Sequence, residues 1–60
     1  MLEVERVKPA IELLSTVLET DPLQIEAHYL RGIALETEGR SAEAQKDFLT
    51  AEQLNRQQEP

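Results

Sequence analysis

Few side chains in this 60-residue sequence could carry out chemistry. His28 is the only histidine and there is no cysteine, so a nucleophile–base pair or a thiolate metal site lacks its usual members. Glu36 and Glu38 are two residues apart, and such residues do not face one another on a helix. We therefore expect no catalytic, cofactor-binding or metal-binding residues and no enzymatic activity, with His28 as a packed or surface residue.

The remaining polar candidates are also interpreted as structural. Glu43 and Asp47 would be neighbours at i, i+4 on a helix, where we interpret both as solvated, and a metal ion would need more ligands than two carboxylates. Ser41 is placed as a helix cap. Gly32 and Gly39 are isolated, so the sequence has no glycine-rich phosphate-binding loop.

The charge and length of the chain exclude several classes of partner. The formal net charge is -6, with twelve scattered acidic side chains and no basic stripe, which argues against nucleic acid and against anionic membranes. The sequence has no apolar run long enough to span a bilayer and no apolar core of a signal peptide, so we expect a cytoplasmic protein. A chain this short is marginally stable alone, which favours oligomerisation or attachment to further protein.

Hydrophobic periodicity predicts three helices and no strands. The first should cover residues 9–20, with an apolar stripe at i, i+3, i+4, i+7 and i+8: Ala10, Leu13, Leu14, Val17 and Leu18. Asp21-Pro22 should end it, and a second helix should cover residues 23–38. Apolar residues lie on more than one side of this second helix, which predicts that other helices cover two of its sides.

A third helix should follow over residues 42–55, after a turn in which Gly39 is a left-handed C-cap and Ser41 an N-cap. Glu43 would lie in its first turn, where a carboxylate suits the helix dipole. Its inner stripe should consist of Ala44, Phe48, Ala51 and Leu54. Gly32, which costs about 1 kcal/mol inside a helix, should mark the point where this third helix approaches closely, with Phe48 filling the space.

The sequence also repeats weakly with an offset of 34 residues. Arg6, Ala10 and Thr16 match Arg40, Ala44 and Thr50, while Leu14 falls opposite Phe48 and Val17 opposite Ala51. Together with Gly32, Gly39 and the Tyr29–Leu35 stretch, this spacing resembles the tetratricopeptide repeat (TPR) family. The resemblance implies three units: residues 1–22 as the second helix of a partial repeat, residues 23–56 as a complete helical hairpin, and residues 57–60 as a frayed tail.

The resemblance implies an all-α fold, a three-helix fragment of a right-handed superhelix, that works in protein–protein interaction. First helices of such repeats line a concave face that holds a protein or peptide partner; here this face would present Glu26, Tyr29, Leu30, Ile33, Glu36 and Thr37. The carboxylate-gripping subclass uses lysine, asparagine and arginine at positions where this chain has Tyr29, Leu30 and Ile33, so an apolar, somewhat basic helical or extended segment is the expected partner.

Other interpretations stay open. Tyr29, Leu30 and Ile33 could instead be core residues, packed on the first helix or on a copy of this chain. One and a half repeats leave apolar surface at the open ends, so the chain could be an assembly piece that forms a homo-oligomer through its first helix or through these three residues. It could equally be a fragment of a longer repeat array.

Overall fold

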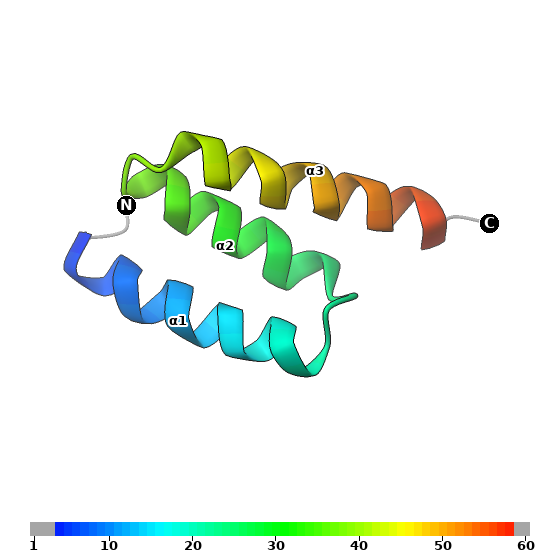
Figure 1. The fold of residues 1–60 in the computed structure, drawn as a ribbon, viewed down its shortest axis with the longest axis horizontal. Helices are drawn as coiled ribbons and strands as arrows, with labels where there is room; N and C mark the ends of the chain where they lie inside the picture. Colours follow the sequence, from blue (N-terminus) through cyan, green and yellow to red (C-terminus); the bar gives the residue numbers. More distant parts are fainter. Residues whose placement is uncertain (1–3, 59–60) are drawn as a thin grey trace.

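Three helices lie side by side in chain order in the computed structural model of this protein (Figure 1), which describes the backbone of residues 4–58 and the side chains of residues 7–58. They are α1 (Val4–Thr20), α2 (Ile25–Thr37) and α3 (Ser41–Gln58). Both α1 and α3 pack on α2, and within the described residues they do not pack on one another. The predictions of an all-α fold and of a second helix covered on two sides are confirmed.

Helix α1 begins at Val4, so the predicted start at Pro9 is wrong. Pro9 is the sixth residue of the helix, where it withholds one backbone hydrogen bond and would ordinarily disturb the first turns. The turns before it are nevertheless kept, and they contain Val7, whose side chain is completely buried. Burial of the Val7 side chain stabilises the turns ahead of Pro9 and offsets the cost of the proline, and helix propensity alone does not include this contribution.

The turn after α1 contains Asp21 and Pro22, as predicted, but α2 begins later than predicted. An oxygen of the Asp21 carboxylate accepts a hydrogen bond from the Leu23 amide at 3.2 Å, which holds residues 21–23 in a turn. Pro22 and Leu23 therefore lie outside the helix, and α2 covers Ile25–Thr37 rather than residues 23–38.

Gly39 ends α2 in the predicted left-handed conformation, with φ 84°. Its amide donates to the Glu36 carbonyl at 2.9 Å, and the Arg40 amide donates to the Leu35 carbonyl at 2.9 Å. These two bonds are the Schellman pattern, which satisfies carbonyls that the helix end leaves without partners.

The expected N-cap role of Ser41 is wrong by one position. Helix α3 begins at Ser41 itself, and the carbonyl of Arg40 accepts the Ala44 amide at 3.0 Å, so Arg40 occupies the capping position. Glu43 lies in the first turn as predicted. The helix continues to Gln58 rather than to residue 55; of the predicted tail 57–60, residues 57 and 58 are therefore helical, and 59–60 lie outside the described residues.

The core is a set of mostly small apolar side chains on facing helix surfaces: Val7, Leu18, Ala27, Ala34, Leu35, Ala44, Ala51 and Leu54. The predicted close approach at Gly32 is confirmed, because a Cβ added there would lie 2.7 Å from Cε1 of Phe48. A contact that short is sterically forbidden, so only glycine lets the Phe48 ring lie this close to α2.

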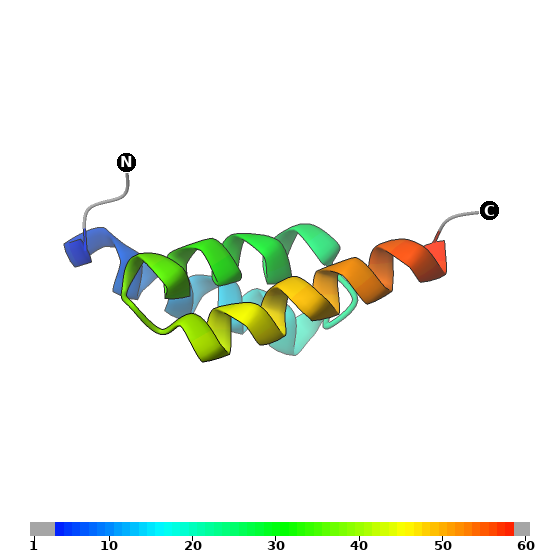
Figure 2. The same cartoon turned by 90° about the horizontal axis from the view of Figure 1, so that it is seen from above.

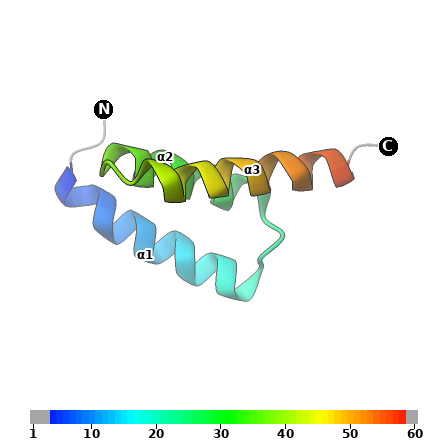
Figure 3. The same ribbon diagram turned by 45° about the horizontal axis from the view of Figure 1, so that its top comes forward.

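The two outer helices are arranged differently relative to α2. Figure 2 shows α3 alongside α2 with its C-terminal end extending past it, as expected for helices of 18 and 13 residues. Figure 3 shows α1 inclined away from the α2–α3 pair toward the turn that leads into α2. None of the helices in the described part of the chain is long and apolar enough to cross a membrane.

Candidate functional site

The residues that the sequence predicts for partner binding all lie on α2, and most are exposed. Tyr29 and Leu30 are exposed by 53% and 44%. The remaining polar members of the set, Glu26, Glu36 and Thr37, are also exposed, while Ile33 is half-buried. Packing within this chain therefore leaves Tyr29 and Leu30 largely open, so the alternative in which α1 covers them is wrong for these two side chains.

Tyr29 forms one wall of a groove between α2 and α3. Its ring lies 5.5 Å from the Phe48 ring, centroid to centroid, at an interplanar angle of 56°, a favourable tilted aromatic pair. The groove has a volume of about 380 Å³ and is lined by Ile25, Tyr29, Phe48, Ala51, Glu52 and Asn55. Because the Phe48 ring that lines this groove also lies against Gly32, the shape of the groove depends on the same contact that joins the two helices.

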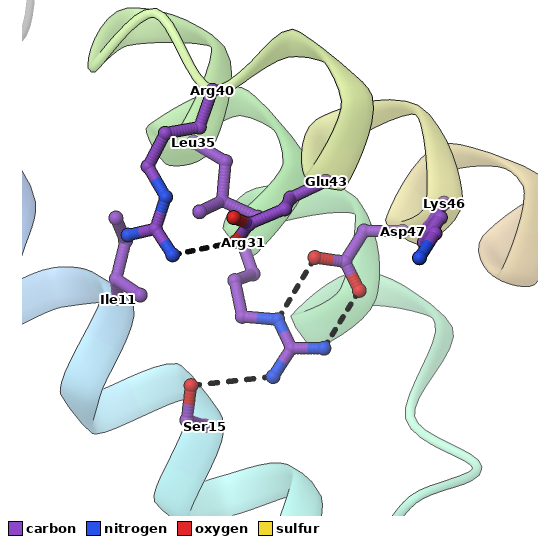
Figure 4. Close-up of a pocket in the computed structure, with 8 residues that line it drawn as sticks. All are labelled: Ile11, Ser15, Arg31, Leu35, Arg40, Glu43, Lys46 and Asp47. Atoms are coloured by element: carbon purple, nitrogen blue, oxygen red, sulfur yellow. Dashed lines mark hydrogen bonds and ion pairs between the residues drawn. The ribbon is translucent and has the colours of Figure 1, made fainter.

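A network of polar side chains joins α1, α2 and α3 (Figure 4). Nε and Nη2 of Arg31 donate to the two carboxylate oxygens of Asp47, each at 2.8 Å, which makes a bidentate pair. Nη1 of Arg31 donates to the Ser15 hydroxyl on α1 at 3.2 Å. Asp47 is only 5% exposed, so this pair is shielded from water on the carboxylate side.

His28 extends the network into the α1–α2 turn. Its Nε2 lies 2.8 Å from the Pro22 carbonyl oxygen, and its Nδ1 lies 3.2 Å from Oδ1 of Asp47. A carbonyl only accepts, so Nε2 carries a proton, and the second bond forms when Nδ1 also carries one. With Nε2 bonded to the Pro22 carbonyl, Nδ1 facing the Asp47 carboxylate and only 9% of the residue exposed, His28 is a packed histidine.

A cavity of about 320 Å³ lies beside this network, lined by Ile11, Ser15, Arg31, Leu35, Arg40, Glu43, Lys46 and Asp47. Its guanidinium groups already face carboxylates: Arg31 pairs with Asp47, and Arg40 donates to Glu43. Figure 4 shows these pairs on its walls. Two of the three cationic side chains of the lining, Arg31 and Arg40, are therefore neutralised by carboxylates of the same lining, which disfavours an anion there.

The environment of Asp47 shifts its ionisation. Burial raises the pKa of the Asp47 carboxyl, but the hydrogen bonds from Arg31 and His28 lower it by more, and the pKa lies below its ordinary value. The hydrogen bond to Asp47 correspondingly raises the pKa of Arg31, against the opposing effect of burial. Both shifts favour the ionised pair.

We expect this pair to contribute a pH-dependent part of the stability. A carboxyl whose pKa is lower in the folded state contributes stability above its unfolded pKa of about 3.9, and this contribution is lost as the pH falls through the folded pKa. Urea denaturation from pH 7 to pH 2.5 should thus show the wild type and Asp47→Asn furthest apart above pH 5, with the difference shrinking below about pH 4. An equal difference at pH 3 and pH 7 would contradict this assignment.

Sequence reasoning missed the role of Asp47, which was interpreted as solvated. The signal was present: Asp47 is three residues after Ala44 and four before Ala51, at positions that share the inner stripe of α3. A carboxylate on such a stripe needs a buried partner. His28 and Arg31, three residues apart on α2, are the partners that were available.

A comparison of this chain with protein-family models, with curated proteins and with solved structures finds no match.

Proposed function

We propose that this protein is an interaction module of the tetratricopeptide-repeat type, which binds an apolar helical or extended segment of a partner protein. The observation that carries this proposal is the exposed Tyr29 ring, which stands beside Leu30 on α2 and forms the wall of the apolar groove above Phe48. Aromatic residues are the side chains most enriched among strong contributors to protein binding. Ile33, Thr37 and the carboxylates of the same helix complete the binding face.

The charge of this face suggests the chemistry of the partner. Glu26 and Glu36 are exposed on α2, and Glu52 lines the α2–α3 groove. A partner segment with one or two apolar side chains for the groove and lysine or arginine beside them would match both features. The acidic side chains would mainly raise the association rate, while the apolar anchor would provide most of the affinity.

A fluorescently labelled amphipathic peptide made of leucine and lysine tests this proposal. By anisotropy, Tyr29→Ser should weaken binding of this peptide about tenfold, the loss of roughly 1.4 kcal/mol expected for an aromatic contact. Added salt should also weaken it, since the attraction is between exposed charges. A peptide with glutamate in place of lysine should bind more weakly and associate more slowly.

Leu49→Ser is the matched control, because Leu49 is an apolar residue exposed by 51% that does not line the groove. It should leave peptide binding unchanged. Equal effects of Tyr29→Ser and Leu49→Ser, with both variants fully helical by circular dichroism, would refute the proposed face.

A further inference from the structure

One face of α1 carries an apolar stripe that the described residues of the chain cover only in part. The stripe consists of Ala10, Leu13, Leu14 and Val17; Leu13 is exposed by 66%, the largest value among the exposed large apolar side chains, and the other three are half-buried. Within the described residues, α1 packs only on α2, and the buried Val7 and Leu18 lie beside Leu14, about 20–40° round the helix at 100° per residue. The stripe is therefore partly covered along its Leu14 edge and most open at Leu13.

The 34-residue offset shows that the fold buries the equivalent face elsewhere. The counterparts of the stripe on α3 are Ala44, Asp47, Phe48 and Ala51, and the first, second and fourth of these are exposed by 1%, 5% and 5%. On α3 this face packs against α2. The stripe on α1 is therefore the kind of surface that this architecture covers with a helix.

We propose that a second copy of this chain covers the stripe, by antiparallel pairing of α1 with α1 of the partner copy. The stripe is self-complementary: about a two-fold axis between residues 13 and 14, Leu13 meets Leu14 and Ala10 meets Val17 of the other copy. Each contact then occurs twice, as a two-fold interface requires. The small Ala10 opposite Val17 allows the two helices to approach closely.

The residues that flank the stripe would not repel a second copy, although both copies carry the same net charge. Pro9, Thr16 and Thr20 flank its outer side and are uncharged. The hydroxyl of Thr16 donates to the Glu12 carbonyl at 3.0 Å, and the hydroxyl of Thr20 donates to the Thr16 carbonyl at 3.5 Å. Both hydroxyls can therefore be buried in an interface and still donate to a carbonyl of their own helix. Glu12 and Glu19 lie about 150–170° round the helix from the midline of the stripe, at 100° per residue.

Sedimentation tests the interface. The wild-type chain should be dimeric at high micromolar concentration, and added salt should strengthen the dimer by screening the net charge of -6 on each copy. Leu13→Glu should raise the dissociation constant at least 100-fold while helicity is retained. Leu49→Glu, which places the same charge on an exposed leucine of α3, should leave the dimer intact. A folded wild-type monomer at these concentrations, or equal disruption by both variants, would overturn the proposal.

Single-cysteine variants test the orientation, since the natural sequence has no cysteine. Mixing Ala10→Cys with Val17→Cys chains under oxidation should give mainly the mixed disulfide, because only antiparallel pairing brings residue 10 next to residue 17. Two copies of residue 10 would be offset by seven residues, about 10 Å along the axis, which is too far for a disulfide. Predominance of the two homodisulfides, or no disulfide, would overturn the pairing. Because Tyr29 lies outside the stripe, Tyr29→Ser should leave the dimer intact even if peptide binding fails.

Discussion

Replacing Asp47 with alanine is expected to lower the free energy of unfolding by about 3 kcal/mol. The variant leaves the Arg31 guanidinium and the His28 ring without the carboxylate that both contact. Breaking a buried pair by removing one partner typically costs 3–5 kcal/mol, and the 25% exposure of the Arg31 side chain places the expected value near the lower end. Urea denaturation followed by circular dichroism measures it.

Glu43→Ala is the matched control for Asp47→Ala. Glu43 lies one turn earlier on the same helix and pairs with Arg40 at the surface, where such a pair contributes at most about 0.5–1 kcal/mol. If the two variants were equally stable, the buried network would not be a major source of stability. The double variant Asp47→Leu with Arg31→Met should recover part of the loss, since it removes both charges together.

The second large effect is expected at Gly32. In an ordinary helix Gly→Ala gains about 1 kcal/mol. Here the added methyl would lie 2.7 Å from Cε1 and 2.9 Å from Cδ1 of Phe48, so the ring must move out of its place between the helices. Overpacking of this kind costs about 1–3 kcal/mol, and we expect Gly32→Ala to destabilise the protein by about 2 kcal/mol, measured by the same denaturation experiment.

The variant Phe48→Leu tests whether the cost of Gly32→Ala comes from the clash with the Phe48 ring or from the loss of glycine at this position in general. In that background the side chain that meets the new methyl is smaller and more adaptable, and Gly32→Ala should become nearly neutral. Gly39→Ala provides the contrast, because nothing lies within 4 Å of its added Cβ and its cost comes from φ 84°. That cost, about 1 kcal/mol, should be the same with Phe48 or leucine. A cost of Gly32→Ala that is unchanged by Phe48→Leu would contradict the steric explanation.

Much of the fold followed from local patterns in the sequence. The helical stripes, the Asp21-Pro22 break and Gly39 located all three helices and both turns, because periodicity and turn chemistry are local properties. The exact ends of the helices were harder to predict from the sequence. The start of α1 ahead of Pro9 depends on the burial of Val7, a tertiary contact that propensity does not contain.

Only part of the candidate site could be predicted from the sequence, for a similar reason. The resemblance to the tetratricopeptide repeat placed Tyr29 and Leu30 on an outward face of α2, and both are exposed. It did not show that the Tyr29 ring would stand beside Phe48, since this depends on how closely α2 and α3 approach. The burial of Asp47 was missed because its meaning depends on partners sixteen and nineteen residues away in the sequence.

The guanidinium of Arg31 gives two helices that do not pack on one another a shared hydrogen-bonding partner, with Ser15 of α1 on one side and Asp47 of α3 on the other. Without it, α1 and α3 would interact only through their separate contacts with α2. With it, the opening of α1 and the opening of α3 are thermodynamically coupled, and the free energy of losing both is not the sum of losing each. The hydrogen bonds of this one side chain thereby add a direct link between α1 and α3 to the contacts that each makes with α2.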